Sequence, residues 1–139
     1  MFYHVKVQFS SVNESGARIK EKHEVLVDNC ELFAEAEQKA LHEFIYAGVG
    51  DVEVTNMKRS NIMEFANSHQ GGDDENIYTA TIVSIFVEEN GKEKETKYHV
   101  GVFAKSVNDA TSIVQQYMKM GLLDMRLVSV KETKIESVL

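Results

Sequence analysis

The feature that most constrains this chain of 139 residues is a similarity between its two halves. Short matches recur in the same order, at an offset that falls from 75 to 73 residues along the chain, so two small deletions account for the drift. The matched positions are Tyr3 with Tyr78, Gly16 with Gly91, Val25 with Val100, Val27 with Val102, Ala36 with Ala110, Val54 with Leu127, Lys58 with Lys131 and Ile62 with Ile135. This order predicts an internal duplication.

Each half has the same succession of hydrophobic patterns. Residues 3–10 alternate between apolar and polar side chains, which is typical of a half-buried strand. Gly16 and the pair Asn90-Gly91 then predict a hairpin, for which Asn-Gly favours a tight type I′ turn. A second strand follows, then a stripe with the period of a helix, with Gly48 as a candidate C-cap and Ser106 as a candidate N-cap. The third strands are expected at 52–57 and 125–130.

These patterns predict an α+β fold, built by duplication of a β-β-α-β unit. We expect two mainly antiparallel three-stranded sheets, each with one helix. The first repeat is expected over residues 1–65 and the second over 77–139, joined by a flexible, acidic, Gly-containing link at 66–76. About 62 residues bury little apolar surface alone, so the repeats are expected to share one core as a single pseudo-twofold domain.

The charge is unevenly distributed. Residues 1–65 carry −4, residues 66–76 carry −3 and residues 77–139 are neutral, which sums to the net charge of −7. Proteins that bind nucleic acid nonspecifically need an excess of Lys and Arg, so this balance argues against such a partner without excluding it. The sequence has neither a long apolar run nor a basic-then-apolar start, and we therefore expect a cytoplasmic protein without a membrane partner.

The run Val54-Thr55-Asn56-Met57-Lys58-Arg59-Ser60-Asn61, the aromatic N-terminus and the segments 26–28 and 35–37 together resemble a bacterial and phage family. That family is catalogued as domain of unknown function 4494. The resemblance extends over nearly the whole chain, and the sequences of the family also look like two related halves. The family's run resembles Val-Thr-Asp-Ile-Lys-Arg, from which this sequence departs at Asn56 and Met57. The resemblance implies a small cytoplasmic protein of bacterial or phage origin and implies no reaction.

No pattern typical of catalysis is present in the sequence. The five histidines form neither HxH nor HExxH, and the nucleophile elbow, Walker loop and GxGxxG turn are missing. Cys30 is the only cysteine and is flanked by Asp28 and Glu31, which oppose thiolate formation. His4 and His23 are expected to lie near each other across the first hairpin. We therefore predict no enzyme activity, no catalytic residue, no cofactor and no metal site.

Two features indicate binding. Strand 81–87 is apolar on both faces, which predicts burial within the chain or an oligomer interface at Val83, Ile85 and Val87. The ends of the two third strands keep a matched lysine, and a pseudo-twofold axis would make these ends equivalent. The predicted contacts with an anionic ligand or partner are Lys58, Arg59, Asn61 and Lys131.

The favoured function is a non-catalytic binding or interaction module that associates with itself or with a protein partner. A small anionic ligand is a further expected partner. One alternative is a nucleic-acid-associated accessory protein that uses the Lys58-Arg59 face and the strand aromatics. Another is a phage-type protein that sequesters a small nucleotide.

Overall fold

The computed structural model describes residues 1–48, 50–68, 74–121 and 124–139. By its contacts the chain divides into two compact units. Unit 1 consists of residues 1–60 together with 135–139, and unit 2 consists of residues 61–134. Both are α+β, as the sequence predicts.

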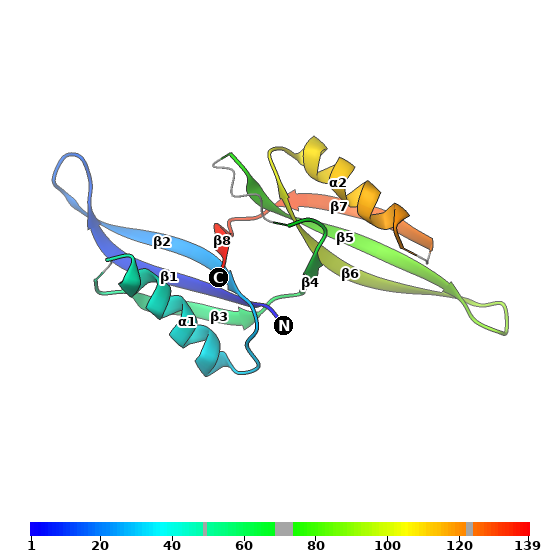
Figure 1. The fold of residues 1–139 in the computed structure, drawn as a ribbon, viewed down its shortest axis with the longest axis horizontal. Coiled ribbons are helices and arrows are strands. Elements are labelled where there is room, and N and C mark those ends of the chain that lie inside the picture. Colours follow the sequence, from blue (N-terminus) through cyan, green and yellow to red (C-terminus); the bar gives the residue numbers. More distant parts are fainter. Residues whose placement is uncertain (49, 69–73, 122–123) are drawn as a thin grey trace. The chain divides into compact units, whose positions relative to one another are not determined.

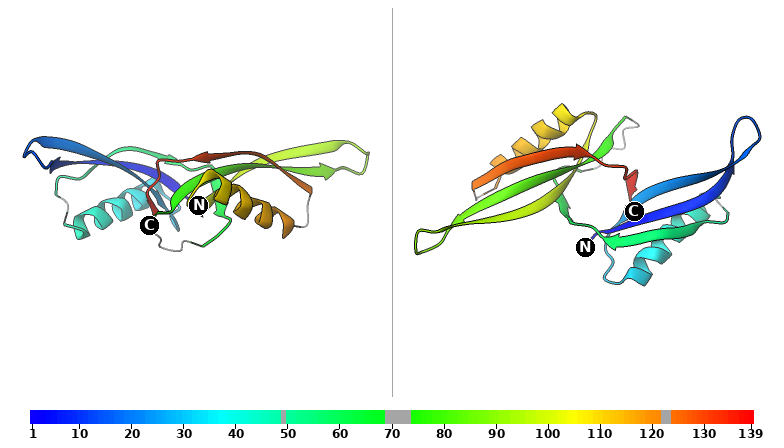
Figure 2. Two further views of the ribbon diagram at one scale, coloured as in Figure 1. Left: turned by 90° about the horizontal axis from the view of Figure 1, so that it is seen from above. Right: turned by 180° about the vertical axis from the view of Figure 1, so that it is seen from behind.

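Unit 1 is a four-stranded sheet with one helix on one face (Figures 1 and 2). The strand order is β3-β1-β2-β8, antiparallel except for the parallel pair β2 and β8. The elements are β1 (Tyr3–Val12), β2 (Arg18–Val27), α1 (Phe33–Tyr46), β3 (Glu53–Arg59) and β8 (Ser137–Val138).

Unit 2 repeats this plan with the order β4-β6-β5-β7, and its parallel pair is β4 and β6. Its helix also lies on one face of its sheet (Figure 2). The elements are β4 (Ile62–Phe65), β5 (Asn76–Val87), β6 (Glu93–Ala104), α2 (Val107–Lys119) and β7 (Asp124–Glu132).

Irregularities of the two sheets fall at matching positions. The β1–β3 register shifts between Lys6 and Val7, and the β5–β7 register shifts between Thr81 and Ile82, 75 residues later. Both hairpins turn on a glycine with positive φ, 81° at Gly16 and 80° at Gly91. Such extra residues and left-handed glycines are local backbone features that a strand pattern alone does not require.

The hairpin turns differ from the predicted type I′. Among the described residues outside glycine, positive φ occurs only at Asn29 and Asp51, so Asn90 is not in the left-handed region. In each loop the glycine donates its N–H three residues back, from Gly16 to the Asn13 carbonyl and from Gly91 to the Glu88 carbonyl. This is a three-residue loop with a left-handed glycine at its end, which suits the twist of long hairpins as well as type I′ does.

The helix ends follow the sequence signals. Ser106 caps α2 by accepting a hydrogen bond from the Asp109 N–H at 3.1 Å, while the Asp109 carboxylate accepts from the Lys105 N–H at 3.0 Å. These contacts satisfy donors that the first helical turn leaves unpaired. At the other helix, Gly48 has φ of 87° and donates its N–H to the Ile45 carbonyl, as expected for a C-cap glycine.

The prediction of three-stranded sheets is wrong, because each sheet has a fourth, parallel strand. These strands, β4 and β8, have only four and two residues, too few to show an alternating pattern. A sheet edge also offers unpaired backbone groups to any nearby extended segment. Each of the two segments that follow a third strand pairs with such an edge.

Each unit has its own cluster of buried apolar side chains beneath its helix. In unit 1 these are Tyr3, Val5, Val7, Val25, Val27, Cys30, Ala36 and Ala40. In unit 2 they are Tyr78, Ala80, Ile82, Val100, Val102, Ala104, Ala110 and Val114. The alanines on the inner side of both helices allow a close approach to the sheet. One core shared by both repeats, and a pseudo-twofold relation between them, stay predictions.

Candidate functional site

The outer face of the first sheet, opposite α1, carries a concentration of basic side chains. Because Val5 and Val7 of β1 and Val25 of β2 point to the helix, the alternate residues lie on the outer face. The charged residues of this outer face are Lys6, Arg18, Lys20, Lys22 and Lys58, with Glu24 and Glu53. We call this set the basic face.

The basic face has the opposite sign to the chain as a whole. Its five basic and two acidic side chains give +3, whereas the full sequence carries −7. All five basic side chains are exposed. Among the described residues, none of them lies within 4.0 Å of a carboxylate oxygen. Their charge is therefore available to a partner rather than neutralised within the fold.

His4 lies at one end of the basic face, near the start of β1. Its Nε2 is 2.7 Å from Oε1 of Glu24, and it lies opposite Lys58 on β3. The pKa of His4 is lowered below 6.5, chiefly because burial penalises the charged imidazole. The Glu24 contact opposes this shift, whereas the positive charges of Lys58 and Lys6 add to it. The two lysines are the smallest of these causes, so the lowered pKa reflects mainly the partial burial of His4.

The shift at His4 predicts a pH dependence of stability. A lowered folded-state pKa means that the unfolded chain binds the proton more tightly. The stabilisation is therefore present above pH 6.5 and is lost as the pH falls through the lowered value. We expect His4→Gln to show a smaller loss of unfolding free energy between pH 7.5 and 5.5 than the wild type. Urea denaturation at both pH values measures this, with the exposed His42→Gln as the control that should behave like wild type. An unchanged pH dependence in His4→Gln would contradict the assignment.

The outer face of the second sheet carries a row of apolar side chains along β5. On it Val83 is 4 % exposed, Ile85 is half-buried and Val87 is 59 % exposed. Val83 lies between Lys97 and Arg126, whose long side chains flank it. The three valine and isoleucine side chains thus form one row along β5, and their role as an oligomer interface stays a prediction.

The residues predicted to contact an anionic partner fall in both units. Lys58 and Arg59 end β3 in unit 1, and both are exposed. Asn61 and Lys131 are exposed residues of unit 2. Lys58 lies opposite His4, and Lys131 lies opposite the matching Thr79. A groove shared by these four residues stays a prediction.

Sequence reasoning missed most of the basic face. The available signal was the alternation of Arg18, Lys20 and Lys22 with less basic neighbours, which places all three on one face of β2. Lys6 and Lys58 join them only through strand pairing across β1. A net charge counted along the sequence does not show such a cluster.

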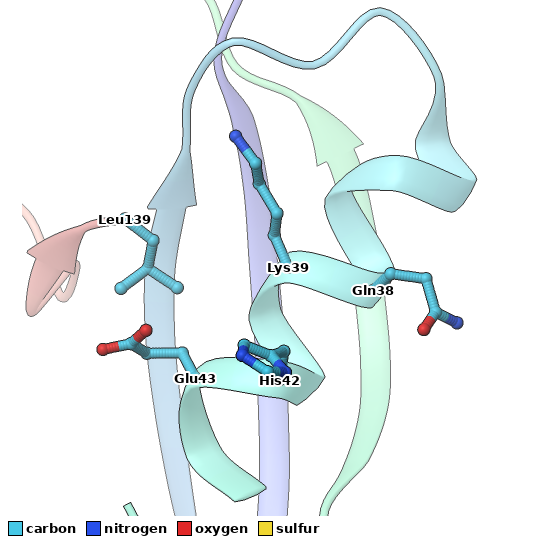
Figure 3. A pocket seen from close by; sticks show the side chains of 5 residues that line it. All are labelled: Gln38, Lys39, His42, Glu43 and Leu139. Atoms are coloured by element: carbon cyan, nitrogen blue, oxygen red, sulfur yellow. The ribbon is translucent and has the colours of Figure 1, made fainter. Parts of the chain in front are cut away.

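Two adjoining depressions lie along α1 in unit 1. One of about 480 Å³ is lined by Gln38, Lys39, His42, Glu43 and Leu139 (Figure 3). The other, of about 610 Å³, shares Gln38 and Lys39 and is also lined by Asn29, Cys30, Ala34 and Glu35. In Figure 3 the Leu139 side chain, from the segment that contains β8, lies beside Glu43 of α1. Lys39 donates its ammonium to the Asp28 carbonyl at 3.0 Å, so its charge is partly engaged within the fold.

The histidine and cysteine side chains connect parts of the scaffold. His4 and His23 do not approach each other as expected, because His23 pairs with Val7 and lies on the opposite face of the sheet. Its Nδ1 is 2.6 Å from the Glu136 carboxylate, and its ring stacks on Phe9. Cys30 is 2 % exposed and donates its thiol to the Asp28 carbonyl at 3.5 Å.

Comparison with known proteins shows the family to which the chain belongs. The family model described as Domain of unknown function (DUF4494) matches residues 1–139. The chain belongs to this family. No curated protein and no solved structure gives a significant match. The arrangement of residues in the structure is therefore the basis for any statement on function.

In the part of the chain that the structure describes, no group of three or more His, Cys, Asp and Glu side chains is placed to hold a metal ion. Neither described helix, α1 or α2, is long and apolar enough to cross a membrane.

Proposed function

We propose that this chain is a non-catalytic cytoplasmic binding module, of bacterial or phage origin, whose basic face contacts an anionic partner. The observation that carries the proposal is a set of five exposed basic side chains on one sheet face of an acidic protein, none of them paired with a carboxylate of the described residues. Bacterial or phage origin is suggested by the family resemblance seen in the sequence.

The regular spacing of charge on the basic face suits a partner with several negative charges. Arg18, Lys20 and Lys22 follow one another at every second residue of β2, a spacing of about 6.6–6.8 Å along a strand. Lys58 contributes from the far side of β1, and Gln8 and Asn56 add uncharged donors. Charge of one sign gathered on one surface steers an oppositely charged partner and raises the association rate.

The non-catalytic part of the proposal is supported by what the reactive side chains do. Each of the two histidine–carboxylate pairs joins neighbouring strands, His4 to Glu24 and His23 to Glu136. Cys30 is buried beneath α1 and engaged by the backbone. In these positions the two histidine–carboxylate pairs and Cys30 act as structural contacts of the fold.

We further propose that the two units are duplicated repeats. Support comes from the equal offset of 75 residues between the bulges at Lys6/Val7 and Thr81/Ile82, and between Gly16 and Gly91. The backbone adds a matching pair of hydrogen bonds, Ser60 N–H to the Phe2 carbonyl at 2.9 Å and Thr133 N–H to the Ile77 carbonyl at 3.0 Å. A duplicated unit keeps such backbone details, although the strand and helix patterns of the sequence do not require them.

A nucleic-acid-associated role is retained as an alternative, in a narrower form. The row Arg18, Lys20 and Lys22 favours it, because nucleic acids are bound largely through phosphate contacts. The strand aromatics on the sheet that carries the basic face, Tyr3 and Phe9, are 0 % and 9 % exposed, so they offer no stacking platform for bases. Sequestration of a small nucleotide has less support, since the two depressions of unit 1 share a single lysine, Lys39.

Charge reversal on the basic face tests the proposal. We expect Lys20→Glu/Lys22→Glu to weaken binding of labelled poly-L-glutamate or oligodeoxythymidylate at least ten-fold at low salt, because two central charges change sign. Fluorescence anisotropy at several salt concentrations measures the affinity, which should fall with salt. The proposal requires only that the partner carries several negative charges, so either polyanion is a suitable probe.

The matched control carries the same change of net charge elsewhere. Lys92→Glu/Lys94→Glu alters exposed residues near the hairpin of unit 2 and should leave the affinity within about two-fold of wild type. Equal loss in both variants would show an effect of net charge only. Failure of the wild-type protein to bind either probe would refute the proposed function.

A further inference from the structure

The fourth strand of each sheet comes from a segment that follows the third strand of the other unit. Segment 135–139 follows β7 and adds β8 to β2, whereas segment 62–66 follows β3 and adds β4 to β6. The registers correspond, with Val138 opposite Leu26 and Phe65 opposite Gly101. Both units therefore accept an extended five-residue segment in one and the same parallel arrangement.

The backbone contacts at the two edges also correspond. Leu139 donates its N–H to the Leu26 carbonyl at 2.7 Å, and Ala66 donates to the Gly101 carbonyl at 2.8 Å. The side chains of Leu139 and Ala66 pack against the core cluster of the unit that accepts them. Backbone pairing at an edge together with one inserted side chain is how many proteins bind extended peptides.

The two segments differ in how firmly side chains hold them. In segment 62–66, Tyr117 donates its hydroxyl to Glu64, and the Phe65 ring stacks on Phe103 with centroids 4.7 Å apart. The amide of the next residue, Asn67, also exchanges two hydrogen bonds with the Phe103 backbone at 2.8 and 2.9 Å.

Segment 135–139 is held by backbone hydrogen bonds at both of its ends. Glu136 donates its N–H to the Glu24 carbonyl at 2.8 Å, and the Asp28 N–H reaches the Leu139 carbonyl at 3.3 Å. Its side chains also contribute: the Glu136 carboxylate lies 2.6 Å from His23, Leu139 packs on the core cluster, and Ile135 is 8 % exposed. A depression of about 480 Å³ remains beside Leu139, so the inserted side chain does not fill the space against α1 (Figure 3).

We propose that the edge between β2 and α1 is a peptide-accepting groove, and that its partner in trans is segment 135–139 of a second copy of this chain. We call it the acceptor groove. The occupant is present in every copy, and the boundary between the units lies at Lys134/Ile135, so exchange replaces only five residues. The exchanged segment re-forms the same backbone bonds, which makes domain swapping a low-cost route to self-association.

The chain's own segment 135–139 competes with the same segment of a second copy, and the outcome depends on the effective concentration of the tethered segment. A tethered segment competes at an effective concentration in the millimolar range for short flexible connections. The chain's own segment therefore fills the acceptor groove in dilute solution, and exchange becomes populated as the protein concentration approaches that range. The acceptor groove uses the backbone edge of β2, whereas the basic face uses its side chains, and the inference does not depend on the function proposed for that face.

A labelled peptide with the sequence of residues 133–139 tests the acceptor groove on the full chain. We expect Leu139→Ser, whose own segment is weakened, to bind the peptide at least ten-fold more tightly than wild type, whose groove is occupied. Glu136→Pro removes the backbone donor to Glu24 and should act in the same direction through a different contact. The exposed Met63→Ser is the matched control in the other segment and should equal wild type.

Sedimentation of the wild-type protein supplies a test that needs no variant. At high protein concentration we expect a dimer, which an excess of the 133–139 peptide converts to monomer, while a peptide with serine in place of its last leucine has no effect. Equal peptide affinity of wild type and both variants would overturn the acceptor groove. A dimer that persists in excess peptide would overturn exchange with a second copy.

Discussion

Ile82→Ala is expected to lower the free energy of unfolding by about 2–5 kcal/mol, the usual range for truncation of a fully buried isoleucine. Ile82 is 0 % exposed on the central strand of unit 2, in the cluster beneath α2. It also lies next to the register shift between β5 and β7. Urea denaturation followed by circular dichroism measures the change.

Val7 and Val128 provide a matched comparison for Ile82. Val7 is 1 % exposed and lies at the corresponding bulge of unit 1, so Val7→Ala should also destabilise, by less because fewer carbons are removed. Val128 is 49 % exposed on β7, and its replacement by alanine should change stability by less than about 0.5 kcal/mol. If Ile82→Ala were no more harmful than Val128→Ala, the assignment of the second core would be wrong.

Gly101→Ala is expected to destabilise the protein by about 1–3 kcal/mol, the usual cost of overpacking. A Cβ atom built on Gly101 meets Phe65 ring atoms at 2.5–2.7 Å, far inside contact distance. The ring has little room to retreat because it stacks on Phe103. The matching pair in unit 1 is Leu26 and Val138, in which the large and small residues are interchanged. Thermal or urea denaturation measures the loss.

A double-mutant cycle with Phe65→Val tests the steric origin of this effect. With the ring removed, Gly101→Ala should lower the free energy of unfolding much less than it does in the wild type, so the two changes are coupled. Gly50→Ala is the control, since a Cβ there meets nothing within 4 Å, and it should be close to neutral. Purely additive free energies for Gly101→Ala and Phe65→Val would contradict a clash.

The sequence identified elements whose signals are local. Alternation along residues 3–10 and the helical stripe that contains Ala36 and Ala40 depend on side chains a few positions apart, and both elements are present. The Ser106 cap and the Gly48 C-cap are likewise set by nearby backbone groups. The type I′ turn was predicted wrongly because Asn-Gly suits more than one loop, and the choice depends on the register of the strands that it joins.

The binding surfaces were much less accessible to sequence reasoning. Of the basic face only Lys58 was identified as a candidate, because Lys6, Lys20 and Lys22 become neighbours only when β1 pairs with β2 and β3. The chain's acidic total concealed this local excess of positive charge, since net charge is a sum over all faces of the molecule.

By itself the sequence determined the class of fold, the order of the two long hairpin strands, the helix and the third strand in each half, the C-terminal end of α1 and the N-terminal cap of α2, because these follow from periodicity and capping over a few residues. Tertiary structure decided the fourth strand of each sheet and the gathering of charge opposite α1. Both arise from pairing between residues far apart in the chain. Segments as short as β4 and β8 have almost no pattern of their own, and they become strands because a sheet edge offers them backbone partners.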